Sequence, residues 1–309
     1  MVQIENMVKR YGKLVALDHL NLEVRDGEIF GLLGPNGSGK TTAINCLLAL
    51  LKFDKGSIRI AGKEMQPDAY DLKQKIGVVM QNVAVFEQLN VTENIDYFCG
   101  LYVQDKKRKK ELVEEAISFV GLQNYRKMRP KQLSGGLLRR LNIACGIAHK
   151  PSLIVMDEPT VAVDPQSRNK ILEGIKELNQ RGATVIYTSH YMEEVEQICD
   201  RVAIIDHGRV LACGTTEELK SMIKTGETIT IEGILLGEEN LQELRELPHV
   251  FEIDYRESIL VVRCSKAKHN LVRILDYLKG KEISFGRVFS ELPTLNDVFL
   301  EITGKELRD

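Results

Sequence analysis

The sequence lacks the features that mark several large classes of protein. No apolar run approaches the ~20 residues that a membrane-spanning helix requires, and the first residues lack the basic region and apolar core of a secretory signal peptide. The formal net charge is only −2, which argues against general nucleic-acid binding. We therefore expect a cytosolic protein, attached to a membrane only where another chain holds it there.

Cysteine is scattered along the chain and forms no C-x-x-C pair. This spacing gives neither a zinc-site pattern nor a disulfide framework, so the cysteines are interpreted as small core residues in a reducing compartment. They are Cys46, Cys99, Cys145, Cys199, Cys213 and Cys264. With 309 residues, of which 43% are hydrophobic, the chain is long enough for two domains with sizeable cores.

Residues 34–42 match the phosphate-binding template G-x-x-x-x-G-K-[ST] at every fixed position. The apolar run at 29–33 is typical of a buried strand, and residues 43–51 are typical of an amphipathic helix. Glycines let backbone N–H groups turn toward phosphate oxygens, and the helix start adds the positive end of its dipole. The alternative, a glycine-rich turn that binds nothing, is disfavoured by the complete template. The nucleotide-binding candidates are Gly34, Asn36, Gly37, Ser38, Gly39, Lys40, Thr41 and Thr42.

Lys40 and two downstream carboxylates supply the charges that triphosphate chemistry needs. Lys40 would reach the β- and γ-phosphates, and Thr41 would hold magnesium. The apolar strand at 153–156 ends in Asp157 and Glu158, which can serve different purposes because side chains alternate along a strand. Asp157 suits magnesium, and Glu158 suits a general base for the attacking water. Solvated acids at a strand end are the weaker alternative, given the upstream phosphate loop.

Strand-like and helix-like segments alternate as far as residue 205, which predicts a mostly parallel sheet with helices on both faces. Short half-buried strands are expected at 2–4 and 20–24, with a turn and an exposed aromatic residue at 9–13. Beyond a change of composition near 224–227, the pattern is that of a small α+β unit. We predict an ATP-binding domain over 1–222, with a helical subdomain at about 91–150, and an accessory domain over 223–309.

Ser134, Gly135 and Gly136 directly precede a helix that runs to Ala148, so the start of that helix would hold a second anion. An ordinary serine cap is the alternative, and taken alone it would be the better one. Taken together and in order, however, the motifs resemble those of the ATP-binding subunit of ABC transporters. The resemblance covers roughly the first two-thirds of the chain and rests on Tyr11, Gly34–Thr42, Gln81, Leu133–Gly136, Leu153–Glu158, Asp164 and His190.

The resemblance implies an α/β P-loop NTPase fold of the ABC ATPase type and adds four site residues. Tyr11 would stack on adenine, or be a surface tyrosine. Gln81 would touch magnesium or water and sense a membrane partner, or be a solvated loop residue. His190 would contact the γ-phosphate, or be a polar surface residue, and Asp164 would lie in a loop crossing between subunits, or cap a helix. The predicted catalytic residues are Glu158, His190, Lys40 and Gln81, and the predicted magnesium ligands are Thr41, Gln81 and Asp157.

Within this family, Ser134 and Gly136 complete the γ-phosphate site of a second subunit. The resemblance therefore implies ATP and Mg²⁺ as cofactors, a second ATP-binding subunit with a homodimer favoured, and a separate membrane permease that docks on residues 91–130. The stretch 289–304 resembles the tail of drug-, antibiotic- and sodium-export ATPases, with a dimer-bracing or regulatory role, or is simply a helix that closes a small domain. No nucleic-acid partner is expected.

Two segments depart from the family pattern. Leu137 stands where glutamine is common, and Val161–Val163 replace a glycine- or serine-leucine pair. Neither change removes a phosphate ligand, a magnesium ligand or the candidate base, so they bear on the rate and on subunit communication. The favoured function is ATP hydrolysis that energises export at the inner face of the cell membrane. The alternatives are a soluble ABC-type switch acting on a ribosome or DNA, and a nucleotide sensor, against which Glu158 and His190 argue.

Overall fold

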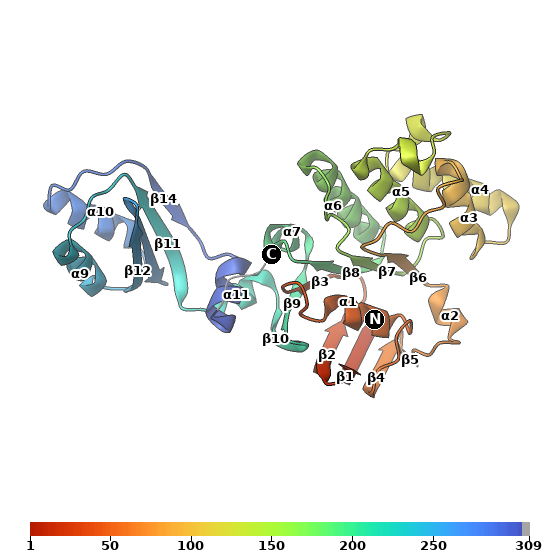
Figure 1. The fold of residues 1–309 in the computed structure, drawn as a ribbon, viewed down its shortest axis with the longest axis horizontal. Coiled ribbons are helices and arrows are strands. Elements are labelled where there is room, and N and C mark those ends of the chain that lie inside the picture. The colour runs from red at the N-terminus through yellow and green to blue at the C-terminus, as the bar shows by residue number, and fades with distance from the viewer. Residues whose placement is uncertain (305–309) are drawn as a thin grey trace. The chain divides into compact units, whose positions relative to one another are not determined.

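The computed structural model describes residues 1–304. These divide into two compact units, Met1–Thr215 and a second unit that begins at Thr216 (Figure 1). Helix α8 (Thr216–Ser221) belongs to the second unit, where it packs against α11 (Leu295–Thr303). The domains proposed from the sequence, 1–222 and 223–309, place α8 on the other side of the boundary and remain a prediction.

The first unit contains most of the secondary structure. Its strands are β1 (Val2–Tyr11), β2 (Leu14–Val24), β3 (Ile29–Leu33), β4 (Lys55–Ile60), β5 (Lys63–Glu64), β6 (Ile76–Val79), β7 (Leu153–Asp157), β8 (Thr184–Ser189), β9 (Arg201–Asp206) and β10 (Arg209–Gly214). Its helices are α1 (Lys40–Leu47), α2 (Tyr70–Lys73), α3 (Val91–Gly100), α4 (Lys106–Phe119), α5 (Gly135–Ile147), α6 (Pro165–Gln180) and α7 (Met192–Ile198), with 3-10 turns at Gln123–Tyr125 and Pro130–Gln132.

A six-stranded sheet with the order β10-β9-β3-β8-β7-β6 organises the first unit. Its strands run parallel except β10, which pairs antiparallel with β9. On one face of β3, Phe30 and Leu32 join the core that includes Ile44 of α1. On the other face, a Cβ added to Gly31 would lie 2.9 Å from Val195 of α7. The predicted parallel α/β sheet, with helices on both faces, is confirmed (Figure 1).

A second, antiparallel sheet with the order β2-β1-β4-β5 lies on the α1 side of the first. The turn expected at 9–13 is present but shorter, because β1 continues to Tyr11 and only Gly12 and Lys13 separate it from β2; Tyr11 is exposed, as expected. Both strands are longer than expected, and their pairing contains register shifts. Asn6 and His19 adopt left-handed backbone conformations, with φ of 50° and 54°, which interrupts the alternation by which strands are recognised.

The helices of the first unit follow the expected order with local differences. Helix α1 ends at Leu47 although the apolar pattern continues to Leu51, because Ala49 takes a φ of 52° that a right-handed helix cannot contain. Helices α3, α4 and α5 pack together at the upper right of Figure 1. Within residues 1–304, none of the helices has the length and apolar character needed to cross a bilayer.

His149, just beyond α5, should make the stability of the protein sensitive to acid. Its ring stacks on Tyr102 at a centroid distance of 3.9 Å, and burial lowers the pKa of His149 from 6.5 to about 4. Between these pH values the folded protein binds fewer protons than the unfolded chain, so stability falls as the pH falls. We expect wild type to lose about 2 kcal/mol more unfolding free energy than His149→Phe between pH 7 and pH 5. Urea denaturation at both pH values measures this; equal losses would contradict it.

The second unit is a small α+β fold. It contains α8, β11 (Thr225–Glu232), α9 (Glu238–Glu246), β12 (Val250–Arg256), β13 (Ile259–Ser265), α10 (Asn270–Gly280), β14 (Val288–Glu291) and α11. Its antiparallel sheet has the order β12-β13-β11-β14, which with the β-α-β-β-α-β sequence is the ferredoxin-like arrangement. Ile229, Leu260 and Ile274 lie in its core, and Glu301 of α11 accepts hydrogen bonds from the start of β11.

Candidate functional site

The phosphate loop joins β3 to α1, as its sequence predicted. Gly39 lies at the N-cap of α1 with a φ of 107°, a conformation that favours glycine. Gly34 approaches β9 so closely that a Cβ would lie 2.2 Å from the backbone oxygen of Ile205. The backbone of the loop therefore packs directly against β9 at Gly34 and against β2 at Gly39. Asn36, Gly37 and Thr41 are exposed, Ser38 and Lys40 are buried, and Thr42 is half-buried.

The Lys40 ammonium group lies inside the loop. Its Nζ donates hydrogen bonds to the backbone oxygens of Gly34, at 2.7 Å, and Pro35, at 3.1 Å. The same atom lies 3.5 Å from Oε1 of Glu158. Burial lowers the pKa of Lys40, while the Glu158 carboxylate opposes that shift. The loop thus holds a buried cation beside the carboxylate that was predicted to be the base.

Glu158 is the point at which the predicted catalytic residues meet. Its Oε2 accepts a hydrogen bond of 3.2 Å from Nε2 of Gln81, and its Oε1 lies 3.3 Å from Nδ1 of His190. The residue is 5% exposed. The structure therefore brings together Lys40, Gln81 and His190, which come from three separate parts of the sequence, around one buried carboxylate.

The backbone of Glu158 is strained. It has a φ of 47°, in the left-handed region that costs a non-glycine residue about 1–3 kcal/mol. Its N–H group points to Thr188, 3.0 Å from Oγ1 and 3.2 Å from the backbone oxygen. These contacts with β8 hold Glu158 in a conformation that turns it out of line with β7 and toward Lys40.

Asp157 has one oxygen engaged and one free. Its Oδ1 accepts a hydrogen bond of 2.6 Å from Oγ1 of Thr188, whereas its Oδ2 is buried and has no hydrogen-bond partner within residues 1–304. In the same part of the chain, Oγ of Ser38 and Nδ1 of His190 are also buried without a hydrogen-bond partner. Buried polar atoms are normally paired, so Oδ2 of Asp157 and Oγ of Ser38 are suited to a group from outside the chain, whereas Nδ1 of His190 already faces the Glu158 carboxylate at 3.3 Å.

Ser134 and Asp164 both cap helices. Oγ of Ser134 accepts from the N–H of Leu137 at 3.3 Å at the start of α5. Oδ1 of Asp164 accepts from the N–H of Ser167 at 2.9 Å at the start of α6, and this bond holds the pKa of Asp164 below its usual value. The two helix starts lie against each other, since a Cβ on Gly136 would be 2.4 Å from Oγ of Ser167.

The remaining candidates lie apart from the Glu158 cluster. Among residues 1–304, no hydrogen bond or ion pair joins Ser134, Gly135 or Gly136 to the phosphate loop. Tyr11 is 49% exposed at the end of β1. Its hairpin approaches the phosphate loop through β2, where the backbone oxygen of Ala16 would lie 2.8 Å from a Cβ on Gly39. The roles given to these residues stay predictions.

Sequence reasoning missed Thr188, although it contacts both acids at the end of β7. In the parallel pairing of β7 and β8, Thr188 is the partner of Asp157. The signal was present as a threonine near the carboxyl end of β8, a strand with the sequence TVIYTS. It became meaningful only once the two strands were known to be neighbours in register.

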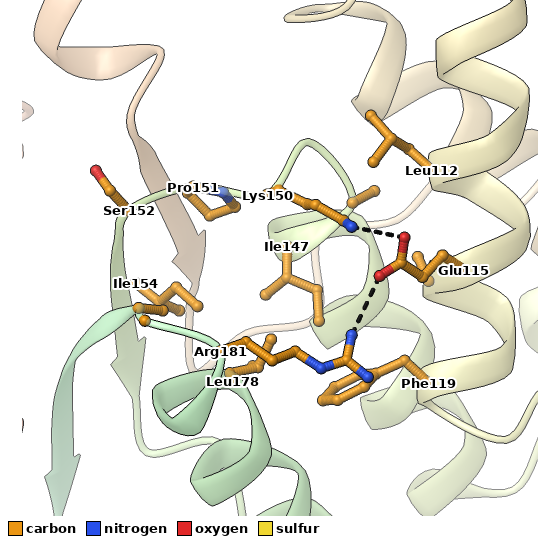
Figure 2. A pocket seen from close by; sticks show the side chains of 14 residues that line it. Leu112, Glu115, Phe119, Ile147, Lys150, Pro151, Ser152, Ile154, Leu178 and Arg181 are labelled. Carbon is orange, nitrogen blue, oxygen red and sulfur yellow. Dashed lines mark hydrogen bonds and ion pairs between the residues drawn. The ribbon is translucent and has the colours of Figure 1, made fainter. Parts of the chain in front are cut away.

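A separate cavity of about 450 Å³ lies between α4, α5 and α6 (Figure 2). Its walls include Leu112, Phe119 and Leu178, and at its edge Glu115 pairs with Lys150 at 2.7 Å and with Arg181 at 3.1 Å. Ser152 and Ile154 place it where β7 begins. The phosphate loop lies where β3 ends, which is the edge at which parallel α/β sheets bind ligands. The cavity is therefore distinct from the Glu158 cluster.

Comparison with known proteins identifies the family. The ABC transporter family model matches residues 17–161, and the model of the C-terminal domain of DrrA1-3-like ATP-binding proteins matches residues 214–303. The chain is 41% identical over 314 residues to the linearmycin resistance ATP-binding protein LnrL of Bacillus subtilis (strain 168), covering 100% of both chains. It is 33% identical over 311 residues to the daunorubicin resistance ATP-binding protein DrrA3 of Streptomyces coeruleorubidus, covering 99% of this chain and 97% of the relative.

Two further matches agree with these. The Nod factor export ATP-binding protein I of Rhizobium sp. (strain N33) is 34% identical over 308 residues, covering 99% of this chain and 98% of the relative. A solved dimeric ATP-binding cassette bound to ADP and Pi superposes with a TM-score of 0.64 at 28% identity, covering 70% of this chain and 98% of that one. The resemblance inferred from the motifs is confirmed. The chain belongs to the ABC transporter family, as an ATP-binding and ATP-hydrolysing subunit of the drug- and antibiotic-export type.

Proposed function

We propose that this subunit binds ATP with Mg²⁺ between two copies of itself and uses hydrolysis to drive export by a separate membrane permease. The observation that carries the proposal is the convergence of Lys40, Gln81 and His190 on Glu158. A buried carboxylate between two potential cations and an amide is placed to accept a proton from water near the phosphate loop. The strained backbone of Glu158 supports the same role, because such strain gathers at functional sites.

The donors near the loop fit a magnesium ion. The free Oδ2 of Asp157 and the hydroxyl of Thr41 would hold it, together with Gln81. Mg²⁺ prefers one or two carboxylates together with phosphates and water, and within residues 1–304 no group of three His, Cys, Asp or Glu gathers to bind a metal alone. When bound, the ion would neutralise charge on the β- and γ-phosphates.

Each protein group then has a defined task. Glu158 takes the proton of the attacking water, and His190 orients that water and the γ-phosphate. Lys40 neutralises phosphate charge, exchanging its bonds to the loop carbonyls of Gly34 and Pro35 for phosphate oxygens. Tyr11 stacks on the adenine ring.

The second anion site supports a dimer. The first amides of α5, at Gly135 and Gly136, have no partner inside the helix and can therefore receive an anion. They lie away from the chain's own phosphate loop, so we assign them to the nucleotide of a second copy, with Ser134. The solved relative that holds ADP and Pi is itself a dimer, and Asp164, packed beside Gly136, would lie at the same interface.

The surface of the α3 region offers a place for the permease. Phe86, Tyr97 and Leu101 are 41%, 47% and 56% exposed, and the rings of Phe86 and Tyr97 meet edge to face. Exposed apolar side chains that cluster in this way mark interaction surfaces. Docking here would hold the subunit at the inner face of the cell membrane. The names of the relatives favour export over a switch acting on a ribosome or DNA.

Charge introduced on this surface should release the subunit from membranes. We expect wild type to sediment with the membranes of its own cells. In the double variant Tyr97→Glu and Leu101→Glu, the fraction bound to membranes should fall several-fold, because docking would bury the new charges against an apolar partner. Immunoblots of membrane and soluble fractions measure the split. Tyr70→Glu is the control, since Tyr70 is 70% exposed on α2. A wild-type chain found wholly in the soluble fraction would contradict permease docking.

A further inference from the structure

A buried polar cluster lies beside the Glu158 site and is centred on Glu194 of α7. Glu194 is 3% exposed. Its Oε2 accepts three hydrogen bonds, from the hydroxyls of Tyr187 at 2.6 Å, Thr160 at 2.8 Å and Ser189 at 3.1 Å. Burial, and then the Glu194 carboxylate itself, raise the pKa of Tyr187, so its phenol keeps the proton that it donates. The mechanism described above assigns no task to this carboxylate.

The other oxygen of Glu194 reaches α6. Oε1 lies 3.1 Å from Nε of Arg168, an ion pair without the geometry of a hydrogen bond. Arg168 lies in the first turns of α6, where its N–H bonds to the backbone oxygen of Asp164, and its guanidinium lies 4.7 Å from the ring centre of Tyr191. One carboxylate therefore contacts residues from three different chain segments.

Each of these segments carries a residue of the site. Thr160 follows Glu158 by two positions. Ser189 directly precedes His190, and its Oγ also accepts a hydrogen bond of 2.9 Å from the N–H of Tyr191, which follows His190. The Ser189 hydroxyl thus ties the backbone on both sides of His190 to Glu194. Arg168 connects the same carboxylate to the helix that Asp164 caps.

We propose that Glu194 is a positioning residue for ATP hydrolysis, which holds the segments of Glu158, His190 and Asp164 at fixed distances from one another. The proposal rests on the function proposed above. A bound nucleotide would contact Lys40 and the phosphate loop, which are outside this cluster. Loss of Glu194 should therefore impair the chemical step and leave ATP binding in place.

The test replaces Glu194 by glutamine in the full chain. The amide keeps the shape but loses the charge that faces Arg168, and we expect kcat to fall about 10- to 100-fold, the size of effect that follows from small misplacements of catalytic groups. The KM for ATP should stay within about twofold, because uniform binding is unchanged. Glu193→Gln is the matched control, since Glu193 is the exposed neighbour on the same helix and should keep wild-type kcat.

Two further variants separate positioning from folding. Arg168→Met should lower kcat in the same way, and its combination with Glu194→Gln should lose no more than the larger single effect, because both act through one contact. ATP-dependent dimerisation in a Glu158→Gln background should survive Glu194→Gln. If Glu194→Gln does not fold, Tyr187→Phe is measured in its place. It should likewise lower kcat and leave the KM for ATP unchanged.

The outcomes distinguish this inference from the function on which it rests. If wild type shows no Mg²⁺-dependent ATP hydrolysis, the proposed function fails. If wild type hydrolyses ATP and the Glu194, Arg168 and Tyr187 variants keep its kcat, the positioning role alone is overturned. A variant that loses ATP binding as much as turnover would also overturn it, since that pattern indicates general damage to the fold.

Discussion

Replacing Glu158 by glutamine is expected to stop ATP hydrolysis and to leave an ATP-bound dimer that can be isolated. The substitution keeps the volume of the side chain and the same unfavourable left-handed backbone, so the fold should be preserved. It removes the group that would accept the proton of the attacking water, which lowers turnover by about 100-fold or more. It also removes a negative charge that lies 3.5 Å from Lys40 and would repel a bound phosphate.

Phosphate release and size-exclusion chromatography measure the two parts of this result. With ATP the variant should elute as a dimer, and with ADP in its place as a monomer, because the second anion site requires the γ-phosphate. Wild type should show the dimer only transiently. A variant that stays monomeric in saturating ATP would contradict the dimer, and one that hydrolyses ATP at the wild-type rate would contradict the role of Glu158.

The second large effect concerns Lys40. Lys40→Met should lower ATP turnover on the order of 100- to 1,000-fold, because the site loses a fixed cation aimed at the phosphates. Unlike Glu158→Gln, it should also weaken nucleotide binding, so no dimer forms with ATP. The hydrogen bonds from Nζ to the carbonyls of Gly34 and Pro35 are lost as well, which loosens the loop even without nucleotide.

Titration with a fluorescent ATP analogue, together with phosphate release, separates these losses. Lys170→Met serves as the control, because Lys170 is exposed on α6 and should bind and hydrolyse ATP as wild type does. Thermal unfolding shows whether the first unit remains folded. Wild-type affinity in Lys40→Met would refute a phosphate-binding role for this loop.

The part of the site that could be predicted is the part that is continuous in sequence. The phosphate loop of residues 34–42 carries its own geometry, since the glycines, the lysine and the helix start act within a few residues of one another. Likewise, Asp157 and Glu158 directly follow an apolar run, so their place at the end of a buried strand could be predicted. Element lengths were less predictable, because left-handed residues such as Asn6 and His19 interrupt the alternation of β1 and β2, and Ala49 ends α1 although the apolar pattern continues.

The sequence by itself therefore determined the reaction class: a triphosphate loop, two acids and an ordered set of motifs that resemble one family. Only the tertiary structure decided which side chains meet. Gln81 and His190 reach Glu158 because β6, β7 and β8 are neighbours in one parallel sheet and end at the same edge. Glu194 acquires its partners in the same way, through contacts between strands and helices distant in sequence. Such contacts depend on which strands become neighbours, and β6, β7 and β8 are segments far apart in the sequence.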